Sequence, residues 1–324
     1  MPTLLRSLFA ALTLALALPV FAQETTIGVD AAVAVDAPLE TGLLWRIDAP
    51  DAPAPSYLFG TIHLIGAEDF LLSDSLMSAL NRVDEVYFEI DPSAMQNPMA
   101  MMPLIQSAMM PAGKSLKGLL SEEEYGRVDA HFSEMGLPMM FLERIKPMFL
   151  SILASTDPSD VKGMMGGGNP MDGMSGEDAK IKSYELELNK VAEQLETPVK
   201  GLETMAFQMS LFDSIPLEAQ AKMLVDAVDH PAAEGDALDA ITKVYVTGDI
   251  EGMYAMSVDE DGGVGGYEAM LLTNRNRNWV APIKESVGAG TALFAVGAGH
   301  LGGPEGVVKL LEAEGYTLTP ISIR

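Results

Sequence analysis

Two short phrases, one near each end of the chain, place a histidine in the same local setting. Residues 60–66 read GTIHLIG and residues 297–303 read GAGHLGG, and both fit the pattern Gly-x-x-His-Leu-x-Gly. Each phrase follows a short apolar run, which predicts a buried strand, a glycine turn and then His63 or His300. Imidazole is a common metal ligand and the commonest general base near neutral pH. The repeated setting therefore predicts one shared site.

The strand ends indicate where this site should lie. Parallel strands of an open α/β sheet end at one edge, and ligands usually bind there. We therefore expect His63 and His300 on one wall of a shared cleft, although they are far apart in the sequence. The alternative is a pair of neutral histidines hydrogen-bonded in tight turns, with the glycines present for backbone reasons.

A metal ion held by the two motif histidines needs at least one oxygen ligand, because the chain has no cysteine and only four histidines. His131 falls in a predicted amphipathic helix, and His230 lies at a predicted helix end. The best-placed carboxylates are Glu89 and Glu203, each at or near the end of a predicted strand. Asp91 shares the face of Glu89 and is the alternative ligand.

Several cations could bind a carboxylate or stabilise an oxyanion, and Arg144 and Arg275 are the better placed among them. We expect Arg277 and Lys146 to form surface salt bridges instead. The chain contains no G-x-S-x-G elbow, H-E-x-x-H helix, Walker loop or dinucleotide fingerprint. The glycine-rich segment 261–266 follows no clear strand and is a weak phosphate signal.

The elements that should position these side chains alternate along the chain. The first two predicted strands form a hairpin, and a helix between the second and third strands makes a βαβ unit. The predicted fold is therefore α/β, with a central mixed sheet flanked by helices. Strands are predicted at 43–47, 57–59, 85–91, 198–203, 291–296 and 316–323, and helices at 73–83, 177–194, 205–212, 217–228, 271–287 and 306–314.

The segment from about 92 to 198, between the two motif phrases, is rich in methionine and in predicted helices. We interpret it as a helical insertion, interrupted by a mobile low-complexity loop around 164–171. Thioethers bind soft Cu(I), but methionine more often fills irregular apolar gaps or lines adaptable binding surfaces, and we favour that role. The densest cluster comprises Met95, Met99, Met101, Met102, Met109 and Met110.

The first residues have the layout of a secretory signal peptide: Arg6, an apolar stretch at 8–18, and small residues before a cleavage point at Ala22. An uncleaved anchor is the alternative. We therefore expect a signal peptide at 1–22, a flexible leader at 23–40 and a single domain at 41–324. The protein should be exported, periplasmic or secreted, with no stable membrane insertion after cleavage.

The formal net charge of −26 limits the classes of partner that the protein can bind. An acidic surface repels nucleic acid and anionic lipid headgroups, so we expect no nucleic-acid partner. Because the acids are scattered along the chain, the charge is more typical of a solvated surface than of a cation-collecting patch. The absence of cysteine excludes disulfides, so stability must come from an ordinary core.

The ordered set of motifs resembles the TraB/PrgY/GumN family, whose animal relatives include the Tiki membrane metalloproteases. The resemblance runs from about residue 43 to 323. It rests on Leu44-Trp45, Tyr57 to Leu64, Val86 to Glu89, Lys146-Pro147, Gly201 to Thr204, Arg275-Asn276 and Val296 to Leu301. The Met- and Gly-rich stretch at 164–174 departs from the family pattern.

The resemblance implies a fold similar to erythromycin-esterase-like and ChaN-like proteins, with the paired G-x-x-H motifs at the active site. It implies a metal-dependent hydrolase acting on peptides or other small molecules. His63, Glu89 and His300 would hold a divalent ion, with Mn, Co and Zn all open. Glu203 would accept a proton from the bound water and Arg275 would stabilise the oxyanion, although Glu89 and Glu203 are interchangeable at this stage.

The chief rival is a non-catalytic protein that captures a peptide or tetrapyrrole in the same cleft. A third hypothesis, copper handling through the methionines, predicts Cu(I) binding that survives loss of both motif histidines. Peptide turnover or stoichiometric capture would distinguish the first two.

Overall fold

The structure is a computed structural model of the 324-residue chain. It describes residues 41–50, 52, 54–92, 106–154, 181–230, 233–258 and 267–323. The predicted signal peptide and leader, the methionines at 95–102, the loop at 164–174 and the glycine segment at 261–266 lie outside these residues. Among the helices of the described ranges, none is long and apolar enough to cross a membrane.

Six strands form a central mixed sheet in the order β6-β4-β7-β2-β1-β8. Strands β6, β4, β7 and β2 run parallel, whereas β1 pairs antiparallel with both β2 and β8. The mixed sheet and the first hairpin are therefore confirmed. The strands are β1 (Leu44–Asp48), β2 (Ser56–Thr61), β4 (Glu85–Ile90), β6 (Val199–Glu203), β7 (Ala292–Gly297) and β8 (Thr317–Ile321).

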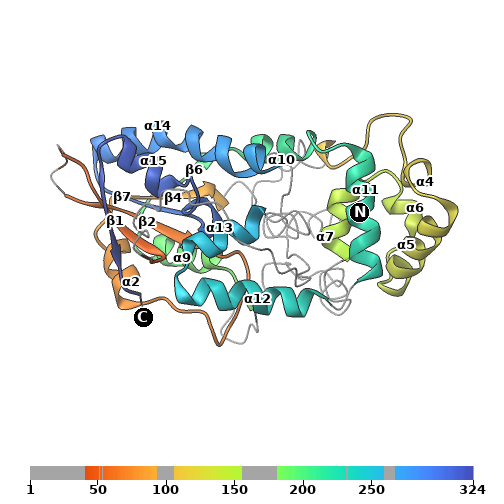
Figure 1. The fold of residues 1–324 in the computed structure, drawn as a ribbon, viewed down its shortest axis with the longest axis horizontal. Helices are drawn as coiled ribbons and strands as arrows, with labels where there is room; N and C mark the ends of the chain where they lie inside the picture. The colour runs from red at the N-terminus through yellow and green to blue at the C-terminus, as the bar shows by residue number, and fades with distance from the viewer. Residues whose placement is uncertain are drawn as a thin grey trace, which may run out of the picture.

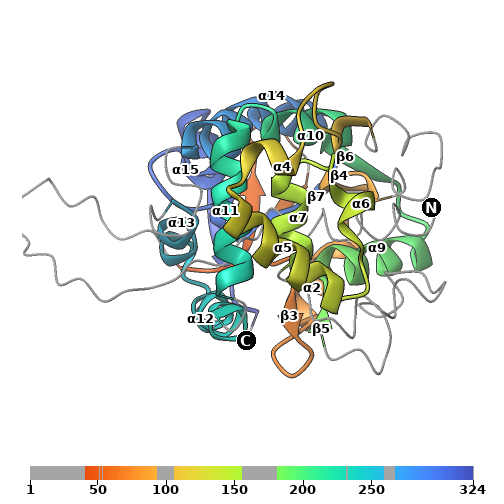
Figure 2. The ribbon, with the colours of Figure 1, turned by 90° about the vertical axis from the view of Figure 1, so that its right-hand side faces the viewer.

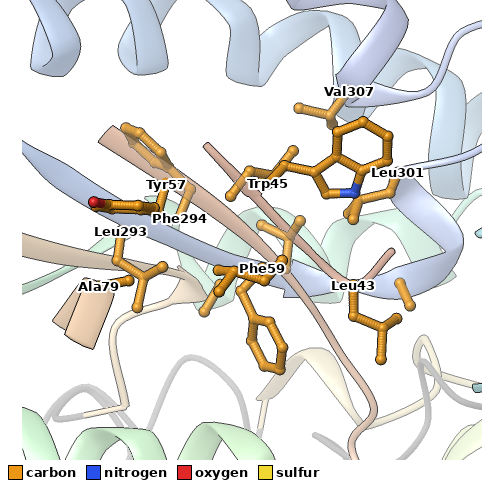
Figure 3. Close-up of a cluster of buried hydrophobic side chains, with 14 of the residues drawn as sticks. Leu43, Trp45, Tyr57, Phe59, Ala79, Leu293, Phe294, Leu301 and Val307 are labelled. Atoms are coloured by element: carbon orange, nitrogen blue, oxygen red, sulfur yellow. The ribbon is translucent and has the colours of Figure 1, made fainter. Parts of the chain in front are cut away.

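Helices cover both faces of this sheet (Figure 1). Helices α14 (Asn274–Ala289) and α15 (Val307–Ala313) lie on one face, and α2 (Asp74–Leu80) and α9 (Tyr184–Gln194) lie on the other. The central strands β2 and β7 bury nearly every side chain, as their continuous apolar runs predict for parallel strands covered on both faces. Figure 3 shows part of the resulting core, in which Trp45, Phe59 and Phe294 are fully buried.

Two predicted helices begin differently from what their patterns indicated. The helix expected at 177–194 begins only at Tyr184, because Ile181–Lys182 forms strand β5, which pairs with β3 (Ile65–Gly66). Ser183 then caps α9 by accepting the backbone N–H of Leu186. The helix expected at 271–287 starts as a π-helical turn, Ala269–Thr273, and becomes α-helical at Asn274.

A second group of helices lies at the far end of the molecule from β1 and β8 (Figures 1 and 2). These helices share a separate apolar core, which α10 and α11 join from beyond residue 198, whereas α9 packs on the sheet. They are α4 (Leu116–Leu119), α5 (Glu122–Glu134), α6 (Met139–Leu142), α7 (Pro147–Ala154), α10 (Met205–Phe212) and α11 (Leu217–Asp229). We call them the helical region, and the sheet with its covering helices the sheet region.

Candidate active site

Four of the predicted site residues lie at, or just after, the carboxyl ends of four neighbouring strands. In the sheet, Gly60 of β2 pairs with Val296 of β7, and Ile90 of β4 pairs with Glu203 of β6. His63 follows β2, Glu89 is the second-last residue of β4, Glu203 ends β6 and His300 follows β7. Because these strands are parallel and adjacent, all four residues lie along one edge of the sheet.

Arg275 connects three of these residues. Its Nη2 donates to Glu89 Oε2 at 2.6 Å and to Glu203 Oε2 at 2.9 Å, and its Nε donates to Glu203 Oε2 at 3.0 Å. Its Nη1 donates to the Leu271 carbonyl and to His300 Nε2, both at 3.1 Å. A guanidinium has five N–H groups, and here all five have an acceptor. We call Glu89, Glu203, Arg275 and His300 the arginine cluster.

The arginine cluster is deeply buried, with the Arg275 side chain only 1% exposed. Burial opposes every charge in it, yet the two carboxylates raise the pKa of Arg275 above its ordinary value. In turn, despite burial, Arg275 holds the pKa of Glu89 far below its usual range. Gln208 from α10 donates to both Glu89 and Glu203, and the Gly297 N–H donates to Glu89 Oε1 at 2.8 Å. The cluster is therefore a fully hydrogen-bonded group of one cation and two anions.

His300 enters the cluster as a neutral imidazole. Its Nδ1 donates to Asn276 Oδ1 at 2.6 Å, because the Asn276 amide nitrogen is already used by two backbone carbonyls and Nε2 accepts from Arg275. Burial and the neighbouring Arg275 lower the pKa of His300 to about 3. The imidazole also packs on Trp279, with ring centroids 4.5 Å apart, and the Arg275 guanidinium lies over the same indole. His300 is held rigidly and stays uncharged at neutral pH.

His63 has different surroundings. Its Nδ1 lies 2.8 Å from Glu185 Oε1 at the start of α9, and its side chain remains 15% exposed. Burial opposes the imidazolium, but Glu185 outweighs it and raises the pKa of His63 to about 9. We call His63 with Glu185 the His63 pair. At neutral pH it combines an imidazolium with a carboxylate.

The turns that carry the two histidines fit closely against the rest of the fold. The carbonyl of Gly60 accepts a hydrogen bond from Tyr245 in α12 (Ala233–Thr247) at 2.9 Å. A Cβ on Gly297 would come within 3.2 Å of Glu89 Oε1, and one on Gly302 within 2.2 Å of the Ile250 carbonyl at the start of α13 (Ile250–Val258). The glycines of the second motif therefore allow α13 and Glu89 to approach the His300 turn.

The predicted pairing of the two histidines at one sheet edge agrees with their placement after the adjacent strands β2 and β7. They do not share a hydrogen-bond partner among the described residues. The charge of His63 does reach His300, because it contributes to lowering the pKa of His300. The other two histidines lie elsewhere: His131 bonds the Ala154 carbonyl, and His230 ends α11 at the surface. Arg277 forms the predicted exposed ion pair, with Glu305.

The arginine cluster, as it lies, does not fit a divalent ion held by His63, Glu89 and His300. An imidazole nitrogen has one lone pair, and that of His300 Nε2 is occupied by Arg275. Within the described residues, no group of three His, Asp or Glu side chains is arranged to hold a metal ion. The metal and its ligand set therefore stay predictions, and Arg275 and the protonated His63 supply the positive charge at this edge of the sheet.

Comparison with known proteins places this edge in a family context. The pattern that defines the TraB/PrgY/gumN family matches residues 43–320, which include both histidine motifs and every residue of the arginine cluster. The chain belongs to the TraB/PrgY/gumN family. A curated relative, Metalloprotease TIKI2 of Danio rerio, is 30% identical over 99 residues, which span 30% of this chain and 18% of that protein. No solved structure matches the chain.

For this member of the TraB/PrgY/gumN family, the sequence predicted the charged residues of the arginine cluster and both motif histidines, but not the residues that hold them in place. Gln208, Glu185 and the acceptor role of Asn276 were not predicted. Glu185 follows Ser183 in the first turn of a helix. An acidic residue in that position is usually explained by its favourable interaction with the helix N-terminus. Only its placement beside His63 reveals a second use.

Proposed function

We propose that the chain is a hydrolase whose substrates are peptides. The observation that carries this proposal is His63: its side chain is 15% exposed, its Nδ1 is held by a carboxylate, and its Nε2 has no hydrogen-bond partner among the described residues. An imidazole held in this way is suited to proton transfer at its free nitrogen. Membership of the family and the match to a protein named as a metalloprotease support hydrolysis as the reaction class.

The chain's own residues suffice to assign the proton transfers. With its pKa near 9, His63 carries a proton at neutral pH and donates it from Nε2 to the leaving amine nitrogen. A carboxylate must accept the proton of the attacking water while the water oxygen bonds to the carbonyl carbon. Arg275 and Gln208 bond both acids, but at Glu89 they engage only Oε2 and leave Oε1 with the Gly297 N–H, whereas Arg275 bonds both oxygens of Glu203. Glu89 therefore suits this role better than Glu203. The proton on Glu89 then returns to His63.

This assignment exchanges the roles first expected for the two acids and leaves Arg275 as the group that holds them. All five N–H groups of Arg275 are occupied, so it acts on the reaction through the positions of Glu89 and His300. No step passes through a divalent ion. Metal dependence, with Mn, Co or Zn, is the finer form of the proposal and requires Arg275 to release His300 Nε2.

The test is a peptide-library assay with purified protein, run after chelation and again with added Mn²⁺, Co²⁺ or Zn²⁺. His63→Ala and His300→Ala should each abolish cleavage, and the double variant should be scarcely worse, because residues acting as one unit are not additive. His230→Ala, which changes an exposed histidine at a helix end, is the matched control. A His63→Ala variant with wild-type turnover would overturn the proposal. If chelated protein regains cleavage only when one of the ions is added, the reaction depends on that metal.

Non-catalytic capture of a peptide or tetrapyrrole is the second candidate. The observation favouring it is the saturation of Arg275, which leaves none of its N–H groups free for an oxyanion. Stoichiometric binding without turnover, lost in His63→Ala, would support capture over hydrolysis.

We also propose export to the periplasm or medium and a fold related to erythromycin-esterase-like and ChaN-like proteins. The signal-like first 22 residues support export, and the mixed sheet with a histidine after two parallel strands supports the kinship. Mass analysis of the N-terminus of protein recovered from the periplasm tests cleavage after Ala22.

A further inference from the structure

The small second sheet lies next to His63 in the chain. Strand β3 begins two residues after His63, and β5 ends three residues before Glu185. The two strands pair antiparallel, with Ile65 opposite Lys182 and Gly66 opposite Ile181. Each strand has only two residues, so this ribbon adds little to the sheet region as a source of stability. Its geometric effect is to bring the start of α9 beside the first histidine turn.

Glu185 is fixed there by three side chains. Its Oε1 accepts the Thr61 hydroxyl at 2.6 Å and faces His63 Nδ1 at 2.8 Å, while its Oε2 accepts the Ser183 hydroxyl at 2.9 Å. Thr61 is the last residue of β2, and Ser183 is the cap of α9, so the carboxylate is anchored from both sides. A carboxylate held by three donors cannot rotate freely, and neither can the imidazole bonded to it.

We propose that Glu185 is the positioning residue of the site: it holds His63 with Nδ1–H toward the carboxylate, which leaves Nε2 as the nitrogen that acts on substrate. The β3–β5 ribbon brings Glu185 to this place. The inference deepens the proposed function and rests on it for the catalytic consequence. It concerns a residue in neither G-x-x-H motif, 122 positions from its partner.

The charges of the two halves of the site support this arrangement. His300 is kept neutral by Arg275, whereas His63 is kept charged by Glu185, so the same motif delivers two imidazoles with opposite protonation. Glu185 stays ionised although burial opposes its charge, because His63 and the Thr61 hydroxyl hold its pKa below the usual range. Without Glu185, nothing described at Nδ1 would select the orientation of the His63 ring.

The experiment compares Glu185→Gln, Glu185→Asp and Thr61→Val, with Glu187→Gln as the matched control. Glu187 lies in the same first turn of α9 but pairs with Lys190. Two readouts are collected on the full chain: imidazole ¹⁵N and Nδ1–H signals, assigned with His63→Ala, and steady-state kinetics on a cleaved peptide. The first readout requires no substrate.

We expect the downfield Nδ1–H signal of His63 to be lost or moved upfield in Glu185→Gln and Glu185→Asp. With a cleaved peptide, kcat should fall about 10- to 100-fold while KM changes less than about threefold, the range for partners that orient a functional histidine. Thr61→Val removes one of the three donors and should lower kcat by only a few-fold. The control Glu187→Gln should match wild type in both readouts.

An unchanged Nδ1–H signal and unchanged kcat in Glu185→Gln would overturn the inference. If Glu185→Gln fails to fold, Thr61→Val decides, because it leaves the charge in place: a wild-type signal and kcat there count against positioning. If the wild type cleaves no peptide but its His63 signal still depends on Glu185, the proposed function fails while the positioning role stands.

Discussion

The sheet region and the helical region are stabilised in different ways. The sheet region buries the arginine cluster, whose members make hydrogen bonds in fixed directions. The helical region buries mainly apolar side chains, including Met135, Met148 and Met209, and its apolar core contains no comparable group of charges among the described residues. Directional contacts fix the positions of neighbouring atoms, whereas methionine adapts to its surroundings. Rigidity is therefore concentrated where the motif histidines lie.

Removing the centre of the arginine cluster should have the largest effect. Arg275→Met leaves Glu89 and Glu203 buried without their cation, and breaking such a group typically costs about 3–5 kcal/mol. Urea unfolding of the variant measures this loss. The control is Arg277→Met two residues on, whose exposed pair with Glu305 should be worth less than about 1 kcal/mol. Equal losses would mean that the buried cluster is no different from a surface pair.

In the helical region, the loss of stability on substituting a core residue should depend on the side-chain volume removed and not on polar contacts. Leu150 is completely buried, and Leu150→Ala should cost about 2–5 kcal/mol through lost burial and the cavity left behind. Met148→Leu at a neighbouring buried position nearly conserves volume and should cost less than about 1.5 kcal/mol. Thermal unfolding of both variants checks this, and a larger loss for Met148→Leu would contradict an adaptable core.

The pH dependence of stability should come mainly from the sheet region. The lowered pKa values of Glu89 and Glu185 stabilise the fold above about pH 4.5, and this contribution is lost as the pH falls through their folded values. The raised pKa of His63 contributes fully below about pH 6.5 and is lost as the pH rises through about 9. The lowered pKa of His300 makes stability fall as the pH drops from about 6.5 towards about 3, because the unfolded imidazole takes up a proton that the folded one does not. Metal-free protein should therefore be most stable near pH 6.5. In Glu185→Gln the alkaline loss should shrink, and an unchanged alkaline loss would count against the pair.

A smaller effect is expected at the surface of the helical region. Ser121 and Glu124 form a capping box at the start of α5, each bonding the other's backbone N–H. Ser121→Ala should cost about 1 kcal/mol in unfolding free energy. Ser133→Ala, on the exposed face of the same helix, serves as the comparison. If the two variants lose the same stability, the capping bonds contribute nothing measurable.

Sequence reasoning succeeded where a local pattern carries the physics. The apolar runs before His63 and His300 predict buried strands, and the turn at Gly315, with φ of +90°, ends α15 as a glycine should. It failed at β5, because two residues are too few for an alternating pattern to appear and the helical spacing of the neighbours extends over them.

The sequence predicted which residues form the candidate site better than it predicted the hydrogen bonds between them. Glu89, Glu203, Arg275 and both motif histidines were chosen from strand ends and the family pattern. Arg275 bonds Glu89, Glu203 and His300, whereas His63 bonds Glu185. The occupation of all five Arg275 N–H groups has no local signature, since its acceptors come from segments up to 186 positions away. Only the three-dimensional structure shows which lone pairs remain.

The position of β7 has a consequence for how the chain is made. This strand lies between β4 and β2, yet it is synthesised about two hundred residues after them. Until it emerges, β2 and β4 each present an unpaired inner edge, and such edges invite pairing with other chains. Pairing over so long a separation is also slow. A nascent or truncated chain that stops before residue 291 would therefore have two half-sheets that cannot join, and it should aggregate more readily than a chain shortened by the same length at its N-terminus.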